Sequence, residues 1–179
     1  RVLFRSITDL RKNIAIVPQE VMLFGGTIYE NIAFGVRLYE NLPKGEMDER
    51  VEWALNKAAL WTEVKDKLNK SGLSLSGGQQ QRVAIARALA MKPTGLLCDE
   101  ITAALDPQLK GEVLGLLAQL REEGLTILMV THEIGFARKS ADRIVLLDGG
   151  KIIEDGPPDQ VLDHSNSART KEFLQQVIG

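Results

Sequence analysis

Four polar residues that could act on a metal ion, a water molecule or a phosphate lie just beyond short aliphatic runs. They are Gln19, Asp99, Glu100 and His132, and they follow the runs 14–17, 95–98 and 125–130. A carboxylate such as Asp99 can hold Mg²⁺ directly or through water, because hard cations prefer oxygen ligands. Glu100 can orient or deprotonate a water molecule that attacks a terminal phosphate. Gln19 is a neutral group able to hold the same metal or water, and His132 can contact the phosphate.

The stretch "LSLSGGQQQR" (73–82) adds a second feature suited to an anion. Gly77 and Gly78 come immediately before a helical pattern that covers about residues 79–90. Glycines at this place let a ligand reach the backbone amides at the positive end of the helix dipole, and Ser76 adds a hydroxyl. We expect a phosphate group to bind here. The alternative is a plain helix cap, because serine is common just before a helix.

A parallel sheet is needed to bring these residues together. Four aliphatic runs have the composition of buried parallel strands, namely 14–17, 95–98, 125–130 and 143–147. Between the second and third runs, Asp106 and Pro107 predict the start of a helix. Open α/β sheets bind ligands at the carboxyl ends of their strands, so the four polar residues are expected to gather at that edge.

The remaining segments indicate how the sheet is elaborated. Residues 1–18 are interpreted as the tail of an earlier β-region, and residues 35–91 have helical spacing without a strand-like run. "DGGK" (148–151) predicts a tight hairpin at the edge, and helical patterns close the chain. We therefore expect an α/β body with an inserted helical subdomain.

Composition narrows the function classes. The 179 residues carry a net charge of −2, which gives no bulk attraction to nucleic acid or anionic lipid. The single cysteine, Cys98, excludes an internal disulfide and suits a reducing compartment. Purely aliphatic stretches reach only about six residues, whereas about 20 are needed to span a bilayer. The opening "RVLFRSITDL" has no signal-peptide pattern.

The order and spacing of these motifs resemble the ATP-binding cassette (ABC) ATPases over essentially the whole chain. "LSGGQ" (75–79) is similar to the signature motif of that family, and "GLLCDE" (95–100) to its Walker B strand with the catalytic glutamate. "AALD" (103–106) is similar to the D-loop, His132 to the switch histidine, and Gln19 to the Q-loop glutamine. The resemblance implies ATP and Mg²⁺ as cofactors.

The family pattern implies a role for each matching residue. Ser76, Gly77, Gly78 and Gln79 would contact the γ-phosphate of ATP held by a second ATPase subunit in a head-to-tail dimer. Gln19 and Asp99 would handle Mg²⁺ in cis, Glu100 the attacking water, and His132 the γ-phosphate. Asp106 would act across the dimer interface. The family further implies an integral-membrane permease, indirect cooperation with a solute-binding protein, and a cytoplasmic place on the inner face of the cell membrane.

By the same resemblance, the fold is a truncated RecA-like P-loop NTPase core of the α/β class. Residues 1–34 would be the N-terminal part of the core with the Q-loop, 35–91 the helical subdomain that ends in the signature motif and its helix, and 92–179 the remaining core. The family's P-loop, G-x-x-x-x-G-K-[ST], does not occur in the 179 residues. Without it, three or more charge-assisted hydrogen bonds would be missing, worth about 4.5 kcal/mol, or roughly a thousandfold in affinity. We therefore expect this chain alone to be inactive.

The motifs leave the transported solute open. "YENIAFGVRL" (29–38) and the region 58–90 are most similar to ATPase subunits of bacterial phosphate importers. "THEIGFARKSADRIVLLDGG" (131–150) is closer to importers of polar amino acids. We favour phosphate, because the helical subdomain that meets the permease carries that signal. Another alternative is a binding-only chain that donates its signature motif. A chromosome-maintenance ATPase is disfavoured, since only about 55 residues without heptads separate Gln19 from the signature.

Overall fold

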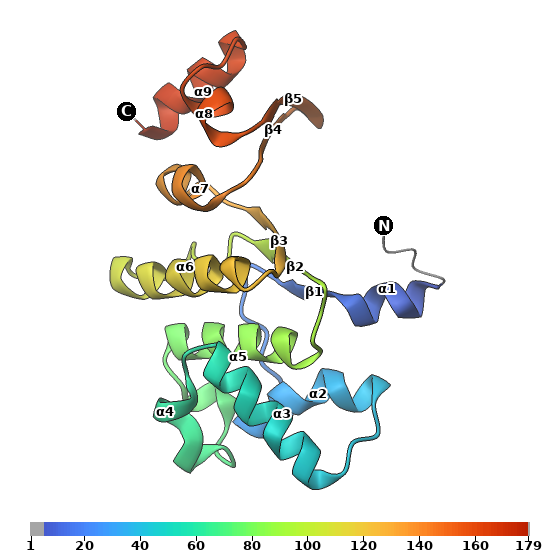
Figure 1. Ribbon diagram of the computed structural model, residues 1–179. Coiled ribbons are helices and arrows are strands. Elements are labelled where there is room, and N and C mark those ends of the chain that lie inside the picture. Colours follow the sequence, from blue (N-terminus) through green and yellow to red (C-terminus); the bar gives the residue numbers. More distant parts are fainter. Residues whose placement is uncertain (1–5, 179) are drawn as a thin grey trace. The chain divides into compact units, whose positions relative to one another are not determined.

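Three parallel strands form the central sheet of the structure, a computed structural model that describes residues 6–178 and the side chains of 6–176. They are β1 (Ile14–Val17), β2 (Gly95–Asp99) and β3 (Thr126–Val130), in the order β1-β2-β3 (Figure 1). The register places Cys98 of β2 between Val17 and Met129. Three of the four predicted strands and their parallel pairing are therefore confirmed, and their carboxyl ends lie at one edge.

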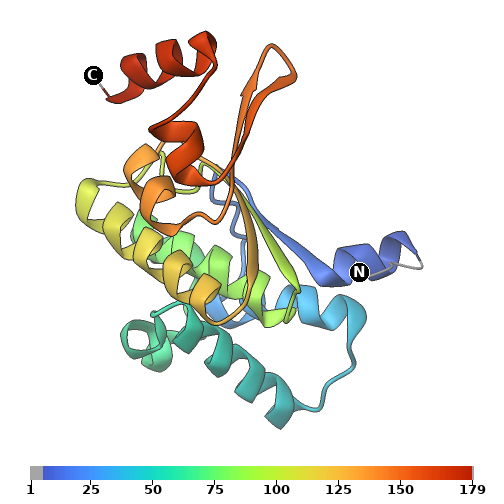
Figure 2. The same cartoon turned by 45° about the horizontal axis from the view of Figure 1, so that its top comes forward.

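The two faces of this sheet differ in burial. Val17, Leu96 and Cys98 share one face and are buried, where α5 (Gly77–Ala90) packs against β1 and α6 (Pro107–Glu122) against β3 (Figure 2). On the opposite face Ile16 is 63% exposed and Leu128 is 65% exposed. The prediction of fully buried strands is thus wrong for β1 and β3, because the described helices of residues 6–130 cover one face of the sheet.

Helices build most of the region between β1 and β2, together with one isolated β-bridge between Thr27 and Ser71. The helical elements are α2 (Ile28–Tyr39), α3 (Lys44–Lys57), α4 (Trp61–Val64), the 3-10 turns η1 (Lys65–Lys67) and η2 (Gly72–Ser74), and α5. Helices α2 and α3 both pack against α5, and Ile32, Leu55 and Ile85 are fully buried among them. The expected helical character of residues 35–91 is confirmed, and α2 begins before that range. The domain boundaries at 34 and 91 stay a prediction.

The start of the described chain differs from expectation. Residues 1–18 were predicted to be the tail of a β-region, whereas α1 (Ile7–Asn13) precedes β1. Ser6 caps this helix by accepting a hydrogen bond from the amide of Asp9 at 3.1 Å. The serine supplies an acceptor for an amide that the first turn leaves without a partner, and this local satisfaction favours a helix over a strand. Residues 1–5 lie outside the description.

Helix α6 follows its prediction closely. Asp106 is the N-cap, Pro107 is the first helical residue, and Gly124 follows the helix with φ +96°. The buried side chains of α6 lie on one stripe: Val113, Leu116, Leu117 and Leu120. The helix between the second and third strands therefore starts and ends at the residues that the sequence predicts.

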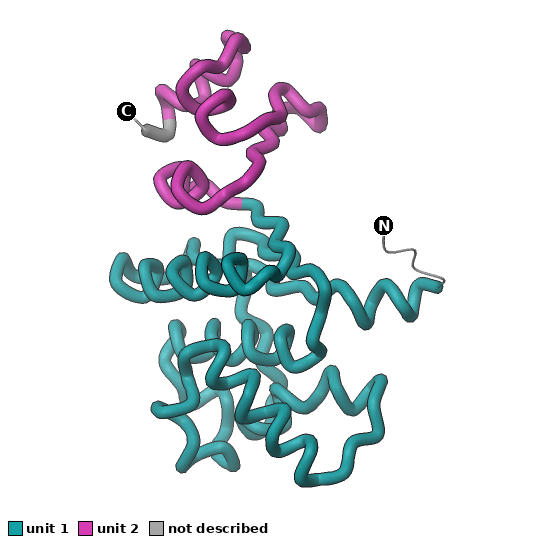
Figure 3. The backbone as a smooth tube through the Cα atoms, viewed as in Figure 1, with its two compact units in different colours: residues 1–130 teal, residues 131–179 magenta. Residues whose placement is uncertain are grey.

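The chain divides into two units, Arg1–Val130 and Thr131–Gly179 (Figure 3). The second unit contains α7 (Ile134–Ser140), β4 (Ile144–Asp148), β5 (Lys151–Gly156), α8 (Pro158–Leu162) and α9 (Ala168–Ile178). Strands β4 and β5 form an antiparallel hairpin, with positive φ at both Gly149 and Gly150 of its turn. The predicted hairpin is confirmed. The prediction of a buried parallel strand at 143–147 is wrong, because the two-glycine turn returns the chain onto that strand and pairs it with β5.

Candidate functional site

The carboxyl ends of β1 and β2 bring two of the predicted residues together. The side-chain amide of Gln19 donates a hydrogen bond to Oε2 of Glu100 over 3.4 Å, although 81 positions separate the two residues. Gln19 is two residues beyond β1, and Glu100 directly follows β2. Parallel pairing places both strand ends at one edge of the sheet, so this contact follows from the topology.

Glu100 has an unusual backbone conformation. Its φ is +42°, a left-handed value that is uncommon for a residue with a side chain. The amide of Glu100 donates to the carbonyl of Val130, and its own carbonyl accepts from the amide of Ala103. Ile101 beside it is buried, with 2% of its surface exposed. These contacts hold the carboxylate at the strand end in spite of a conformation that costs of order 1–3 kcal/mol, as occurs at functional sites.

Asp99 is the last residue of β2, pairs in register with Val130, and is exposed. The donor set at this edge, two carboxylates and one amide, fits Mg²⁺, which takes oxygen ligands and keeps several waters. Among the described residues, no three acidic, histidine or cysteine side chains gather as a ready-made metal site. Asp99 and Gln19 as metal ligands therefore remain a prediction.

His132 is the fourth predicted residue, and it belongs to the second unit. Its Nε2 lies 3.5 Å from Oε1 of Glu133, and its carbonyl accepts a hydrogen bond from the amide of Ile134. Half of its side chain is exposed. A role at the γ-phosphate stays a prediction for this histidine.

The signature-like stretch forms the beginning of α5. The helix starts at Gly77, not at Gln79 as the pattern predicts, with Ser76 as its N-cap. Ser76 Oγ accepts from the amide of Gln79 at 3.4 Å, and Gln79 Oε1 accepts from the amide of Ser76 at 3.1 Å. This reciprocal capping box is the plain helix cap considered above. It satisfies two amides, and anion binding at the same helix end stays a prediction.

The two glycines of this motif have different surroundings. A Cβ added to Gly77 would meet nothing within 4 Å, so the backbone there is open to an approaching ligand. A Cβ added to Gly78 would lie 2.7 Å from Cδ1 of Leu109 in α6. Gly77 therefore suits close approach of an anion, whereas Gly78 allows α5 and α6 to pack against each other.

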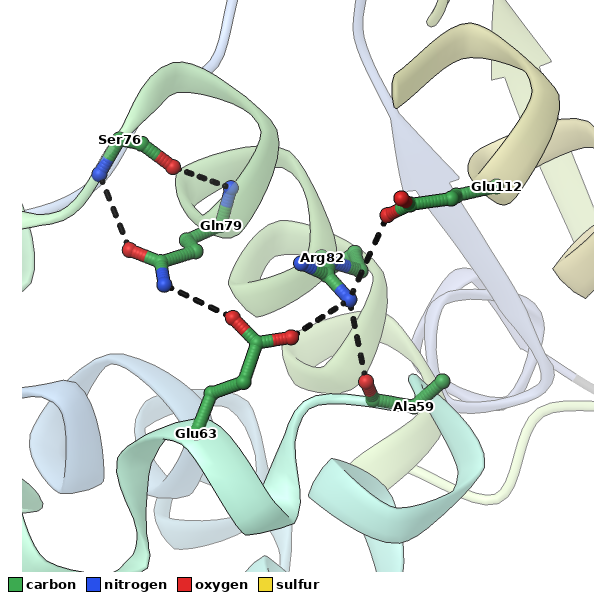
Figure 4. Close-up of polar contacts among 6 residues, drawn as sticks. All are labelled: Ala59, Glu63, Ser76, Gln79, Arg82 and Glu112. Carbon is green, nitrogen blue, oxygen red and sulfur yellow. Dashed lines mark hydrogen bonds and ion pairs between the residues drawn. The ribbon is translucent and has the colours of Figure 1, made fainter. Parts of the chain in front are cut away.

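A polar network fixes the signature-like loop to its neighbours (Figure 4). Gln79 Nε2 donates to Glu63 Oε2 at 2.8 Å, and the other oxygen of Glu63 lies 3.0 Å from Arg82 NH1. The same Arg82 nitrogen donates to the carbonyl of Ala59 at 3.1 Å and lies 3.8 Å from Oε2 of Glu112. Arg82, only 8% exposed, thus joins α4, α5 and α6. Neither Glu63 nor Arg82 was predicted from the sequence as part of the site. The sequence offers one signal for Arg82: it lies one helical turn after Gln79, so the two side chains lie on the same side of α5.

Asp106 also has a structural role. Its Oδ1 accepts from the amides of Gln108 and Leu109 at 3.0 and 3.1 Å, and caps α6. The side chain is exposed. A second role across a dimer interface stays a prediction.

The loop from Gln19 to α2 is fastened to the helical region by two residues that the sequence analysis missed. Asn31 is fully buried; its side chain accepts from the amide of Phe24 at 2.8 Å and donates to the carbonyls of Phe24 and Thr27. Arg87 of α5 donates to the carbonyl of Met22 at 2.7 Å. These hydrogen bonds join the backbone between Gln19 and α2 to α2 and α5.

Comparison with known proteins gives two findings. Residues 1–103 match the family model described as ABC transporter. A solved structure, cbiO1 from Clostridium perfringens, described as part of the ABC transporter complex cbiONQ, is 34% identical with a TM-score of 0.77. The match covers 96% of this chain and 65% of that one, so this chain spans about two thirds of its length. The fold is part of the α/β P-loop NTPase-like ABC domain, with a parallel sheet flanked by helices. The chain belongs to the ABC transporter family.

Proposed function

We propose that this chain serves in the ATP-binding and ATP-hydrolysing subunit of an ABC importer. The observation that carries the proposal is the meeting of Gln19 and Glu100 at the carboxyl edge of the sheet. Glu100 would act on the water that attacks the γ-phosphate, and Gln19 would hold that water or the metal. When bound, Mg²⁺ neutralises charge on the phosphates, and Asp99 and Gln19 would hold it. His132 would contact the γ-phosphate.

A head-to-tail dimer completes this proposal. Ser76 and Gly77 lie at the start of α5, where exposed amides and the helix dipole favour an anion. With Gly78 and Gln79 they would contact ATP held by the second subunit, and Asp106 would act across the interface. The Gln79 side chain donates to Glu63 and its backbone amide donates to Ser76 Oγ, so a contact of Gln79 with the phosphate would replace one of these two hydrogen bonds.

Replacement of Glu100 by glutamine tests the catalytic assignment. The amide keeps the size of the carboxylate but cannot accept the proton of the attacking water. We expect Glu100→Gln to retain ATP binding and to lower steady-state hydrolysis at least about a hundredfold, the range for loss of a general base. The measurement is the steady-state rate of phosphate release from ATP in the presence of Mg²⁺, made on the protein in the form that the cell produces.

Glu20→Gln is the matched control, because Glu20 is an exposed carboxylate next to Gln19. The control is expected to hydrolyse ATP at the rate of the unaltered protein. Unchanged hydrolysis in Glu100→Gln would remove the catalytic role of Glu100.

Exposed apolar side chains between β1 and the end of α2 support an integral-membrane permease as partner. They are Met22, Phe24, Phe34 and Leu38. The rings of Phe24 and Phe34 have centroids 4.5 Å apart, and the Arg87 guanidinium lies over Phe24 at 5.0 Å. Within residues 6–178, no helix combines bilayer-spanning length with a sufficiently apolar sequence. We place the chain on the cytoplasmic face of the cell membrane, held there by the permease.

Phosphate is the solute we propose, with a polar amino acid as the alternative. The support is the similarity of the region 58–90 to phosphate importers. Uptake of radiolabelled phosphate and glutamine, measured in cells with and without the gene for this chain, separates the two. Loss of phosphate uptake alone supports phosphate, and loss of glutamine uptake alone replaces it. A solute-binding protein would deliver either solute.

A binding-only role is the second candidate function. In that case the chain donates Ser76 and Gly77 to ATP on another subunit and hydrolyses nothing. Titration of the 179-residue chain with a fluorescent ATP analogue separates the hydrolysing role from the binding-only role. Micromolar affinity supports a complete ATP site in this chain, and weaker binding supports a chain that only donates its signature motif. The capping box at Ser76 is compatible with this role, since donation needs only the open helix end.

A further inference from the structure

A basic hollow in the helical region has no part in the function proposed above. Its volume is about 650 Å³, within the range of small-molecule sites. Arg37, in the last turn of α2, and all three residues of the 3-10 turn η1 line it. The charged residues that line it are Arg37, Lys44, Lys65, Lys67 and Lys70, together with Asp48 and Asp66. Five positive charges against two negative ones give the wall a formal charge of +3, whereas the whole chain carries −2.

The carboxylates of the hollow do not neutralise its lysines. Asp48 accepts a hydrogen bond from the hydroxyl of Tyr29 at 2.6 Å. Burial, reinforced by this bond, raises the pKa of Tyr29 to about 12, so the hydroxyl keeps its proton at neutral pH. Among the described residues, none of the four lysines of the wall forms an ion pair. Their charges therefore remain available to an anion.

A second hollow continues this surface. Its volume is about 400 Å³, and Tyr29, Arg37 and Lys44 line both hollows. The Arg37 guanidinium lies over the Tyr29 ring, 5.8 Å from its centroid. This stacking restricts the rotamers of the Arg37 side chain, so the side chain loses less conformational entropy when it binds a ligand.

We propose that the larger hollow binds a phosphate-bearing anion with more than one charged group. Ammonium and guanidinium groups donate charge-assisted hydrogen bonds to phosphate oxygens, and several cations on one concave wall favour a multivalent anion. Two sources share this chemistry, a soluble polyphosphate compound and the headgroup of an anionic lipid. The hollow has no residue in common with the candidate nucleotide site, so this proposal goes beyond the proposed function.

Calorimetric titration of the full chain with inorganic tripolyphosphate tests the proposal at low salt. The double variant Lys44→Ala/Lys67→Ala removes two charges from the wall of the hollow. The double variant Lys139→Ala/Lys151→Ala removes the same charge from the second unit and is the matched control. We expect roughly ten- to thirtyfold weaker binding in the first variant only, because each of the two removed charges contributes about three- to fivefold in water. Ser76→Ala is expected to retain the binding, which separates the hollow from the nucleotide site.

A second arm identifies the source of the anion. Co-sedimentation with vesicles of phosphatidylglycerol and phosphatidylcholine is compared for the unaltered chain and the two double variants. Tripolyphosphate binding without vesicle binding assigns a soluble compound, and vesicle binding alone assigns a lipid headgroup. Equal binding by the hollow variant and its control, or binding of neither probe by the unaltered chain, overturns the proposal.

Discussion

At the scale of single residues, neighbouring positions of one motif have different roles. Gly77 and Gly78 are adjacent, yet open space surrounds one and the Leu109 side chain lies against the other. Glu100 combines a half-buried position just beyond β2 with a left-handed backbone, whereas Asp99 next to it is exposed. Residue type and spacing are enough to identify such a motif in the sequence. The three-dimensional surroundings of each residue are needed to separate those that can contact a ligand from those that pack against a neighbouring helix.

Alanine at the two glycines gives a residue-scale prediction. Gly78→Ala places a methyl group against Leu109, so the free energy of unfolding is expected to fall by about 1–3 kcal/mol. Gly77→Ala is its matched control, because its Cβ meets nothing, and a change within about 0.5 kcal/mol is expected. Urea unfolding followed by circular dichroism measures both. Equal losses would mean that Leu109 moves aside or that Gly77 is not open.

At the scale of elements, the signature-like loop is held by the hydrogen bond from Gln79 to Glu63 and by the ion pair of Glu63 with Arg82. Arg82 is nearly buried and Glu63 is about one-third exposed, so their attraction is partly protected from solvent. A surface pair offers a comparison: Lys57 of α3 and Glu123 lie 2.5 Å apart, and both are about one-third exposed. The two pairs differ mainly in the burial of the cation.

A double-mutant cycle with Glu63→Gln and Arg82→Met tests this element-scale difference. We expect a coupling energy of about 1–2 kcal/mol, since the two residues share one hydrogen-bond network. The cycle Lys57→Met with Glu123→Gln is expected to give at most about 1 kcal/mol, as exposed ion pairs do. Urea unfolding of each variant provides the four energies of a cycle. If the coupling energy of Glu63 and Arg82 is no larger than that of the surface pair, burial of Arg82 does not strengthen its attraction to Glu63.

The elements also show what the sequence could predict. Strands β1, β2 and β3 and helix α6 follow from aliphatic runs and from Asp106 with Pro107, because those signals are local. The hairpin of β4 and β5 followed from the two glycines of its turn, whereas the aliphatic run 143–147 alone did not show that this strand lies outside the parallel sheet. Helix α1 was missed although its cap, Ser6 with Asp9, is a local signal. Glu63 was missed because its contacts depend on how α4 packs.

At the scale of the whole molecule, the sheet combines a covered face with an exposed one. Cys98 lies in the central strand on the covered face, with 2% of its surface exposed, whereas Ile16 and Leu128 are exposed on the other side. Burial raises the pKa of the Cys98 thiol to about 12. Because the folded pKa is raised, this group's contribution to stability is complete below the unfolded pKa of about 9. It is lost as the pH rises toward 12.

Thiol labelling of Cys98 tests whether the covered face of the sheet stays packed against its helices although the other face is exposed. The thiol reacts only when an opening of the first unit exposes it, so at about pH 8 we expect labelling at least about a thousandfold slower than in urea. The variant Cys98→Ala/Ser74→Cys, with its thiol in an exposed turn, is the control and is expected to react without protection. Labelling is followed by the absorbance of a disulfide reagent. If Cys98 reacts within about tenfold of the unfolded rate, β2 separates from α5 and α6 readily. In that case the hydrogen bond between Gln19 and Glu100 cannot be maintained by the described sheet, and the catalytic edge would need further contacts to persist.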